Sequence, residues 1–298
     1  MSGPLVIVNP NAGSGRAARL APWLTERLRP FGDAELVITT APGHATELAR
    51  SAVADGRERL VAVGGDGTVQ DVVEGLVGAG AQLSLGIVPQ GSGNDLARSL
   101  GLPLGREPAW EVALGARTRR VDIGQAVGGG RTRRFVSAGG IGFDAQVAAA
   151  MQKRGRWQRG PIGYLLTTLS ELRRFRNRRV RLTLDDGPPE EHTVLLIAVA
   201  NGPYYGGGMK ICPDAQTDDA WLDLCIVGDI SRLTAVQQLP NLYRGTHVNH
   251  PAVSMRRARR VRIEGDTDAR AHLDGEPFGT LPLQIEVVPR ALEVAVSG

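Results

Sequence analysis

Five consecutive residues carry the pattern that points most directly to chemistry: Gly64, Gly65, Asp66, Gly67 and Thr68. Glycines lack a Cβ and let the backbone approach a ligand closely, and a turn that opens a helix presents N–H groups to an anion. A carboxylate would repel a bare phosphate, so Asp66 makes better sense if a divalent cation lies between it and the phosphates. The pattern therefore indicates binding of a metal–nucleotide complex; its alternative is a tight strand-to-helix turn in an ordinary α/β domain.

A second glycine-rich turn contains Asn9, Gly13, Gly15 and Arg16 and follows the first apolar run of the chain. Its glycines and Ser14 can form a nest of N–H groups for an anion, and the guanidinium of Arg16 could bind a phosphate there. It lacks the GxxxxGK[ST] pattern of a P-loop and the GxGxxG pattern of a dinucleotide site. An Asx-type turn therefore stays the alternative.

A third turn contains Gly91, Ser92, Asn94 and Asp95. Its small residues allow close backbone approach, and Ser92 and Asn94 offer hydrogen bonds to a ligand. Asn94 or Asp95 could instead serve only as the N-cap of the next helix. We favour ligand binding because this is the third such turn after a predicted strand.

The elements that position these turns alternate between strand and helix. Apolar runs predict strands over residues 4–8, 34–39, 60–63 and 83–88. Helical spacing predicts helices over residues 16–29, 44–55, 69–77 and 94–100. This order favours an α/β domain over residues 1–120 with an open, mostly parallel sheet. Ligands bind beyond the carboxyl ends of such strands, so the three turns are expected to converge on one crevice.

The pattern of predicted elements changes after residue 120. Short β-rich runs dominate residues 121–289, and only two helical stretches intervene, at about 143–153 and 160–175. Many strands with few helices predict a β-rich, sandwich-like C-terminal domain. A last strand is predicted over 291–296, and the spacing leaves open whether residues 290–298 rejoin the first domain.

Composition limits the compartment and the partners. The 298 residues include only two cysteines, which have no CxxC spacing, and 42% of the residues are apolar. No apolar run reaches the roughly 18 residues of a membrane span, and the N-terminus does not resemble a signal peptide, so we expect a cytoplasmic protein. The net charge of +4 suits nucleotide or an anionic lipid surface, which the basic stretches 153–159 and 173–181 could contact. Too few aromatic residues lie among these arginines for a nucleic-acid platform.

The ordered set of motifs resembles the diacylglycerol kinase catalytic family, which includes bacterial soluble lipid kinases and is related to the sphingosine kinases. The motifs NPxxGxG, GGDGT and PxGSGND occur in that order, and they are followed by VDIG (121–124), GGIGFDA (139–145) and LDGEP (273–277). The resemblance spans the whole chain. GGDGT is shared with NAD kinases, and the resemblance implies an NAD-kinase-like first domain.

The resemblance implies a kinase that uses ATP and Mg²⁺, with nucleotide in the first domain, lipid in the second and the reaction in the cleft between them. Family members hold ATP with positions that map onto Gly64–Gln70, Ser92 and Thr39. Their acidic metal network maps onto Asp66 and Asp122. The lipid is expected at a membrane surface, to which the enzyme binds peripherally.

The family's catalytic carboxylates map onto Asp274 and Glu276, and we favour Glu276 as the base. Phosphoryl transfer to an alcohol needs a carboxylate near the hydroxyl, and two carboxylates two residues apart point the same way if the backbone is extended. Replacing either by its amide is then expected to leave thermal stability nearly unchanged. A surface Asp-Gly turn is the alternative for this motif.

A structural Mg²⁺ site of the family maps onto the loop that contains Asp219, Gln216 and Trp221. Asp219 would give a carboxylate, and Gln216 and Trp221 would give backbone carbonyls. The loop departs from the family's usual Asn-Asp-Gly pattern, so Asp218 is an alternative ligand.

Two other functions remain open from the sequence: an NAD kinase-like enzyme, and a non-catalytic lipid-binding or regulatory protein on the same fold. The identity of the lipid, the preferred nucleotide and the formation of a homodimer are not determined by these motifs.

Overall fold

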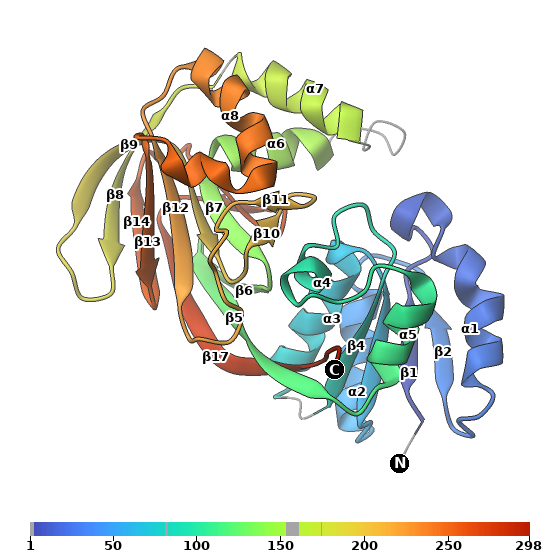
Figure 1. The fold of residues 1–298 in the computed structure, drawn as a ribbon. Helices are drawn as coiled ribbons and strands as arrows, with labels where there is room; N and C mark the ends of the chain where they lie inside the picture. Colours follow the sequence, from blue (N-terminus) through green and yellow to red (C-terminus); the bar gives the residue numbers. More distant parts are fainter. Residues whose placement is uncertain (1–2, 81–82, 153–160, 174) are drawn as a thin grey trace. The chain divides into compact units, whose positions relative to one another are not determined.

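The chain divides into two compact units, each with its own core (Figure 1). Unit 1 comprises Met1–Asp122 and Pro289–Gly298, and unit 2 comprises Ile123–Val288. Strands β5 (Thr118–Gly128) and β17 (Leu283–Ala295) continue from one unit into the other. The computed structural model describes residues 3–80, 83–152, 161–173 and 175–298.

Unit 1 contains a parallel sheet whose strands are almost wholly buried at its centre. The strands are β1 (Leu5–Val8), β2 (Glu35–Ile38), β3 (Arg59–Gly64) and β4 (Ser84–Pro89). They pair in the order β4-β3-β1-β2, and every pair is parallel. β1, β3 and β4 read as continuous apolar runs because helices cover both faces of such a sheet. The predicted mostly parallel α/β domain is confirmed.

The helices of unit 1 depart from the predicted ranges in two places. They are the short 3₁₀ turns η1 (Ala12–Gly15) and η2 (Ala18–Leu20), followed by α1 (Ala21–Leu28), α2 (His44–Ala54), α3 (Asp66–Gly78), α4 (Asp95–Ser99) and α5 (Arg106–Leu114). The α-helix predicted from residue 16 begins only at Ala21, because left-handed Gly13 and Ser14 turn the chain before it. α5 was not predicted; its buried Trp110 and Ala113 pack in the core of unit 1.

The strand predicted over 291–296 is part of β17 and pairs with the sheet of unit 1. Glu293 and Val294 lie parallel to Ser84 and Leu85 of β4. The earlier half of β17 pairs antiparallel with a strand of unit 2, over Leu283–Glu286. The last residues of the chain therefore complete the sheet that carries the glycine-rich turns.

Unit 2 is built mainly from antiparallel strands around an apolar core. Its further strands are β6 (Arg131–Phe135), β7 (Ala138–Gly142), β8 (Arg178–Leu184), β9 (Glu190–Ala200), β10 (Tyr204–Tyr205), β11 (Met209–Lys210), β12 (Leu222–Gly228), β13 (Val253–Ala258), β14 (Arg260–Gly265), β15 (Arg270–Leu273) and β16 (Glu276–Thr280). The main order is β16-β15-β7-β9-β8-β14-β17, with β12 and β13 added at β9. The predicted β-rich C-terminal domain is confirmed.

Three described α-helices gather on one side of the unit 2 strands (Figure 1). α6 (Phe143–Gln152) and α7 (Pro161–Leu172) agree with the two predicted helical stretches. The expectation of only two helices was wrong, because α8 (Arg232–Arg244) is a third, and the 3₁₀ turn η4 (Thr246–Asn249) follows it. α8 carries Pro240 in its interior and has no fully buried residue, so its apolar pattern is weak.

Candidate active site

The three glycine-rich turns of unit 1 meet at the carboxyl ends of β1, β3 and β4. The side chain of Asn9, after β1, donates its Nδ2–H to Thr68 Oγ1 at the start of α3, over 3.0 Å. The backbone N–H of Gln90, after β4, donates to the Gly64 carbonyl over 2.7 Å. Adjacent parallel strands place their carboxyl ends side by side, so turns far apart in the sequence form one surface, as expected.

Glycine is required where these turns touch. A Cβ on Gly91 would lie 2.7 Å from the Cα of Gly65, which is too close for any side chain. A Cβ on Gly13 would collide with the carbonyl oxygen of Gln90. Gly15 and Gly67 differ, since a Cβ there would meet no described atom within 4 Å. These two glycines therefore border open space in which a ligand can approach the backbone.

The first turn has the backbone of an anion nest. Gly13, Ser14 and Gly15 all have positive φ angles, of 58°, 59° and 90°. A positive φ is costly for Ser14, and such strain is often kept where it aims N–H groups at a ligand. Arg16 is exposed and donates its Nε–H to the Gly13 carbonyl, which keeps its guanidinium beside the nest.

Asp66 links the second turn to the third. Its Oδ2 accepts the N–H of Asn94 over 2.8 Å, and its Oδ1 accepts the N–H of Asp95 over 2.5 Å. Burial raises the pKa of Asp66 above its usual value, and the backbone hydrogen bonds oppose this shift. The carboxylate therefore lies at the N-termini of both α3 and α4, where the helix dipoles stabilise negative charge.

The remaining predicted residues of unit 1 lie in two environments. Thr39 directly follows β2 at the same sheet edge, with its N–H bonded to the Val8 carbonyl, and Ser92 is exposed in the third turn. Asp122, in contrast, is completely buried in β5, where its Oδ1 accepts the N–H of Arg290 over 2.7 Å. This bond fixes β17 where it re-enters unit 1, a structural task that the sequence did not indicate. The metal role predicted for Asp122 stays a prediction.

The donor set of unit 1 fits a nucleotide-bound Mg²⁺ rather than a site built from protein alone. Among the described residues, no cluster of three His, Cys, Asp or Glu side chains is placed to hold a metal. The oxygens of Asp66 accept the N–H groups of Asn94 and Asp95 and a further bond from the backbone N–H of Asp66 itself, so about one of the four lone-pair sites remains for a cation. Mg²⁺ commonly takes one or two carboxylates and completes its shell with phosphate oxygens and water. Asp66 is suited to that role.

In unit 2, Asp274 and Gly275 form the two-residue turn between β15 and β16. Leu273 pairs with Glu276 across the hairpin, and the φ angles of Asp274 and Gly275 are 47° and 78°. Positive values at both central positions fit a type I′ turn, for which Asp-Gly is a preferred sequence. The backbone is therefore not extended here, and the expectation that Asp274 and Glu276 point the same way for that reason was wrong.

The carboxylate of Asp274 is occupied by three backbone N–H groups. Its Oδ2 accepts from Val136 over 2.8 Å, and its Oδ1 accepts from Ser137 and Ala138, each over 3.0 Å. A carboxylate has about four lone-pair sites, so few remain for a proton or a substrate. Asp274 thus anchors the turn to the loop that precedes β7, and it is the less suitable of the two carboxylates as a base.

Glu276 is held by an arginine that the sequence motifs did not include. Arg133 of β6 donates from Nη2 to Glu276 Oε2 over 2.7 Å, and the Glu276 side chain is 46% exposed. The charge-assisted bond orients one oxygen and leaves Oε1 for a substrate hydroxyl. Of the two predicted carboxylates, Glu276 has the better geometry for a general base.

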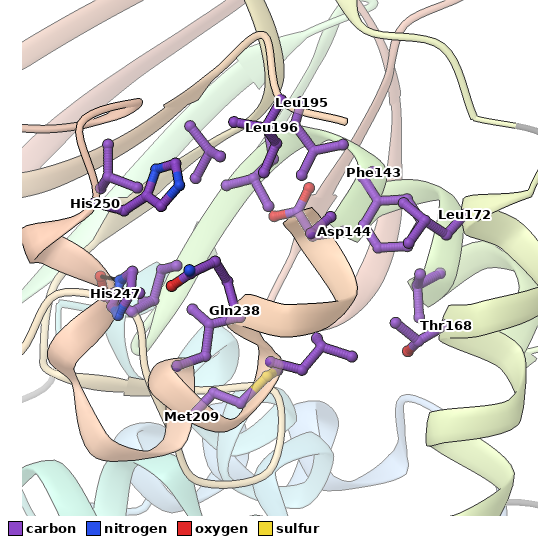
Figure 2. Close-up of a pocket in the computed structure, with 18 of the residues that line it drawn as sticks. Phe143, Asp144, Thr168, Leu172, Leu195, Leu196, Met209, Gln238, His247 and His250 are labelled. Atoms are coloured by element: carbon purple, nitrogen blue, oxygen red, sulfur yellow. Dashed lines mark hydrogen bonds between the residues drawn. The ribbon is translucent and has the colours of Figure 1, made fainter. Parts of the chain in front are cut away.

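An apolar cavity lies within unit 2 between α6, α7, α8 and the strands (Figure 2). It has about 770 Å³ of space between its walls, part of it open to solvent. Phe143, Leu172, Leu196 and Met209 are among its apolar walls. Asp144, Thr168, Gln238, His247 and His250 supply its polar groups. This composition suits a ligand with a long apolar body and a small polar head.

The loop predicted to hold a structural Mg²⁺ contains an arginine close to its acidic groups. Asp219 accepts the N–H of Trp221 at one oxygen and forms an ion pair with Arg257 at the other. Arg257 also lies 3.4 Å from Asp223, whose pKa is raised to about 6 by burial. The guanidinium already compensates both carboxylates, so the structure does not require a metal there. Gln216 is exposed, and the metal assignment of Gln216, Asp219 and Trp221 stays a prediction.

Sequence reasoning missed Arg133 and the cavity. Arg133 lies more than 140 residues from Glu276 and stands among four basic or polar residues of β6, so no local pattern singles it out.

Ala235, Leu239 and Leu242 of α8 line the cavity at helical spacing. Ser231 caps that helix by accepting the Thr234 N–H, and left-handed Gly245 ends it. These two capping residues are the sequence signal from which α8, and with it one wall of the cavity, could have been predicted.

Comparisons with known proteins agree with the division of the chain. A family model for the diacylglycerol kinase catalytic domain matches residues 4–126. A model described as the YegS C-terminal NAD kinase beta sandwich-like domain matches residues 136–296. The two matches together cover nearly the whole chain.

Several relatives are similar over nearly their full length. A diacylglycerol kinase of Mycobacterium tuberculosis is 33% identical over 291 residues, which is 97% of this chain and 93% of the relative. A diacylglycerol kinase of Staphylococcus saprophyticus is 30% identical over 281 residues, 93% and 90% of the two chains. A solved structure of a Bacillus anthracis protein assigned to the diacylglycerol kinases superimposes with a TM-score of 0.80 at 26% identity, covering 99% of this chain and 95% of the other.

Proposed function

The chain belongs to the diacylglycerol kinase catalytic family, and on that premise we propose that it transfers the γ-phosphoryl group of ATP to the hydroxyl of a diacylglycerol-like lipid. Unit 1 binds the nucleotide and unit 2 binds the lipid. Asp66 would hold a Mg²⁺ ion, and the chemistry that such a cation would supply is neutralisation of charge on the transferred phosphate.

The nucleotide assignment is supported by the surface that the three turns of unit 1 form. Backbone N–H groups of Gly13–Gly15 and the N-terminus of α3 suit phosphate oxygens, and Arg16 adds a positive charge. Thr39, Ser92 and Asn94 lie at the same sheet edge and offer polar groups to the rest of ATP. Asp66 is the residue that would hold the cation.

The observation that carries the lipid assignment is the apolar cavity of unit 2. Acyl chains match walls of Phe, Leu, Val, Ile and Met side chains, whereas a polar dinucleotide would leave its hydrogen-bonding groups unpaired there. The cavity therefore favours a lipid kinase over the NAD kinase-like alternative. Glu276, oriented by Arg133, is the proposed base that takes the proton of the lipid hydroxyl.

Filling the cavity should weaken lipid use without affecting ATP. Ala235 of α8 lines the cavity, and Ala235→Phe adds a ring inside it. We expect the KM for long-chain diacylglycerol to rise about tenfold or more while the KM for ATP stays constant, because changes of a few methylene groups in an apolar site alter discrimination on that scale. Steady-state assays in mixed micelles measure both constants.

Gln237→Phe is the matched control, since it adds the same ring on an exposed face of the same helix. It should behave as the wild type. Equal KM values for lipid in all three proteins would mean that the cavity does not hold the acyl chains.

We propose that the enzyme binds the membrane surface peripherally, because its substrate resides there. No helix in the described part of the chain is long and apolar enough to span a bilayer. Leu166 of α7 and Leu233 of α8 are 56% and 68% exposed, so two of the helices that bound the cavity offer apolar side chains to a membrane. The basic stretch 153–159 lies outside the described residues, and in the other stretch Arg178 and Arg181 form ion pairs with Asp268 and Glu191.

Vesicle sedimentation tests this proposal. Binding to anionic phosphatidylserine vesicles should weaken as salt rises to physiological levels, where charges are screened over about 8 Å. Leu233→Asp should reduce the salt-resistant part of the binding. Equal partitioning of the wild type onto neutral and anionic vesicles would show that arginines do not contribute.

A further inference from the structure

Behind the turn that carries Asp274 and Glu276 lies a buried pair that no motif assignment uses. His272 of β15 and Asp144 of α6 are 3% and 7% exposed at their side chains, and His272 Nε2 lies 2.9 Å from Asp144 Oδ2. The ring of Tyr205 stacks on His272 with 6.5 Å between centroids. Both side chains are almost wholly enclosed, so most of the groups around the pair belong to the protein.

The hydrogen bonds fix the tautomer of His272. The N–H of Gly275 lies 3.3 Å from His272 Nδ1, and a backbone N–H can only donate, so Nδ1 is the acceptor. In the neutral ring the proton then resides on Nε2, which donates to Asp144. A carboxylate accepts but cannot donate, so Asp144 enforces this tautomer.

Asp144 is itself held in one orientation. Its Oδ1 accepts the N–H of Ala145 in the first turn of α6 over 2.8 Å. Gly140 makes room for it, since a Cβ there would lie 2.8 Å from Asp144 Oδ2. The same carboxylate reaches the wall of the apolar cavity, as Figure 2 shows. A chain of fixed contacts therefore leads from the cavity wall through His272 to the backbone of the turn.

We propose that Asp144 and His272 are positioning residues of the phosphoryl transfer: Asp144 sets the tautomer of His272, and His272 holds the Gly275 N–H so that the turn presents Glu276 to the lipid hydroxyl. This proposal rests on the proposed function. It matters for rate because a misplacement of about 1 Å at a reacting group can cost on the order of 100-fold.

Two substitutions of His272 separate its two bonds. Asn places its Oδ1 near the position of Nδ1, so His272→Asn retains an acceptor for Gly275 and loses the bond to Asp144. Gln places its Nε2 near the ring Nε2, so His272→Gln retains a donor for Asp144 and loses the acceptor for Gly275. We expect the kcat of His272→Asn, which retains the acceptor for Gly275, to lie about tenfold or more above that of His272→Gln, with the KM for ATP unchanged in both.

Asp144→Asn tests the tautomer. The amide of the substituted side chain can donate to His272 Nε2, which then becomes an acceptor, so the ring proton resides on Nδ1 and faces the Gly275 N–H. A comparable change in a serine protease triad costs about 10⁴ in kcat. Asp144→Asn should therefore lower kcat at least about tenfold, yet have little further effect in the His272→Asn background. Such non-additivity is expected only if the two residues act through one contact.

Two measurements keep this inference separate from the proposed function. ¹⁵N NMR of the histidine ring should show a proton on Nε2 in the wild type and on Nδ1 in Asp144→Asn, and hydrogen exchange at Gly275 should be faster in His272→Gln but not in His272→Asn. If the NMR and hydrogen-exchange results are as expected but the wild type phosphorylates no lipid, the proposed function is wrong, whereas the hydrogen bond between Gly275 and His272 is confirmed. Equal kcat in His272→Gln and His272→Asn, whatever their melting temperatures, would overturn the positioning role.

Discussion

Asp66→Ala is expected to lose Mg²⁺-dependent turnover. Asp66 lies at the N-termini of α3 and α4, where nucleotide phosphates are proposed to bind, and it is the carboxylate best placed to share a cation with them. We expect kcat/KM to fall well beyond tenfold; a tenfold loss corresponds to about 1.4 kcal/mol of transition-state stabilisation. Initial rates measured against Mg²⁺ concentration report the loss.

The structure adds a stability effect that the motif alone did not indicate. Asp66→Ala leaves the N–H groups of Asn94 and Asp95 without their acceptor, at a cost of about 1–3 kcal/mol for each one that stays buried. Asp66→Asn is the sharper variant because it removes the charge and retains one oxygen acceptor. Its melting temperature should lie closer to the wild type while its activity is lost. A retained activity above a tenth of wild type in Asp66→Asn would exclude Asp66 from cation binding.

Glu276→Gln is expected to lower kcat by about 100-fold or more, because a general base commonly contributes 10²–10⁴ to a rate. The amide preserves the shape of the side chain and its hydrogen bond from Arg133, so the fold and the KM for ATP should change little. Steady-state kinetics with saturating ATP and varied lipid separate the two constants.

Glu286→Gln is the control for the same chemical change at an exposed glutamate of β17, which accepts a hydrogen bond from Gln125. It should leave kcat unaltered.

Asp274→Asn forms a second comparison: its amide nitrogen must face one of the N–H groups of Val136, Ser137 or Ala138. This revises the expectation of unchanged stability for Asp274, where we expect a cost of about 1–3 kcal/mol. Normal turnover by Glu276→Gln would remove Glu276 as the base.

The part of the site that the sequence predicted well depends on local chemistry. The turns around Gly13, Gly65 and Gly91 follow apolar runs, and the carboxyl ends of neighbouring parallel strands must lie together. Glycines at backbone contacts and polar residues at helix starts are visible in a single sequence. The convergence of the three turns within unit 1 could therefore be predicted before any coordinates.

The part that the sequence did not predict depends on long-range contacts. Residues that meet through strand pairing, such as Arg133 with Glu276, or His272 with Asp144, carry no local pattern. α8 was missed because its interior Pro240 and half-buried face weaken the helical signal. The Asp-Gly turn that was the alternative for the LDGEP motif is present at Asp274 and Gly275, but no local pattern indicates that the Asp274 carboxylate binds the N–H groups of a distant loop.

The most direct test of the account is the transfer of label from γ-labelled ATP in the presence of Mg²⁺ to a total lipid extract, with identification of the labelled product. The account predicts a labelled phospholipid formed from a diacylglycerol-like alcohol, abolished by chelation of Mg²⁺ and strongly reduced in Glu276→Gln. An enzyme that binds ATP in unit 1 but labels no lipid, or that labels NAD instead, would contradict it.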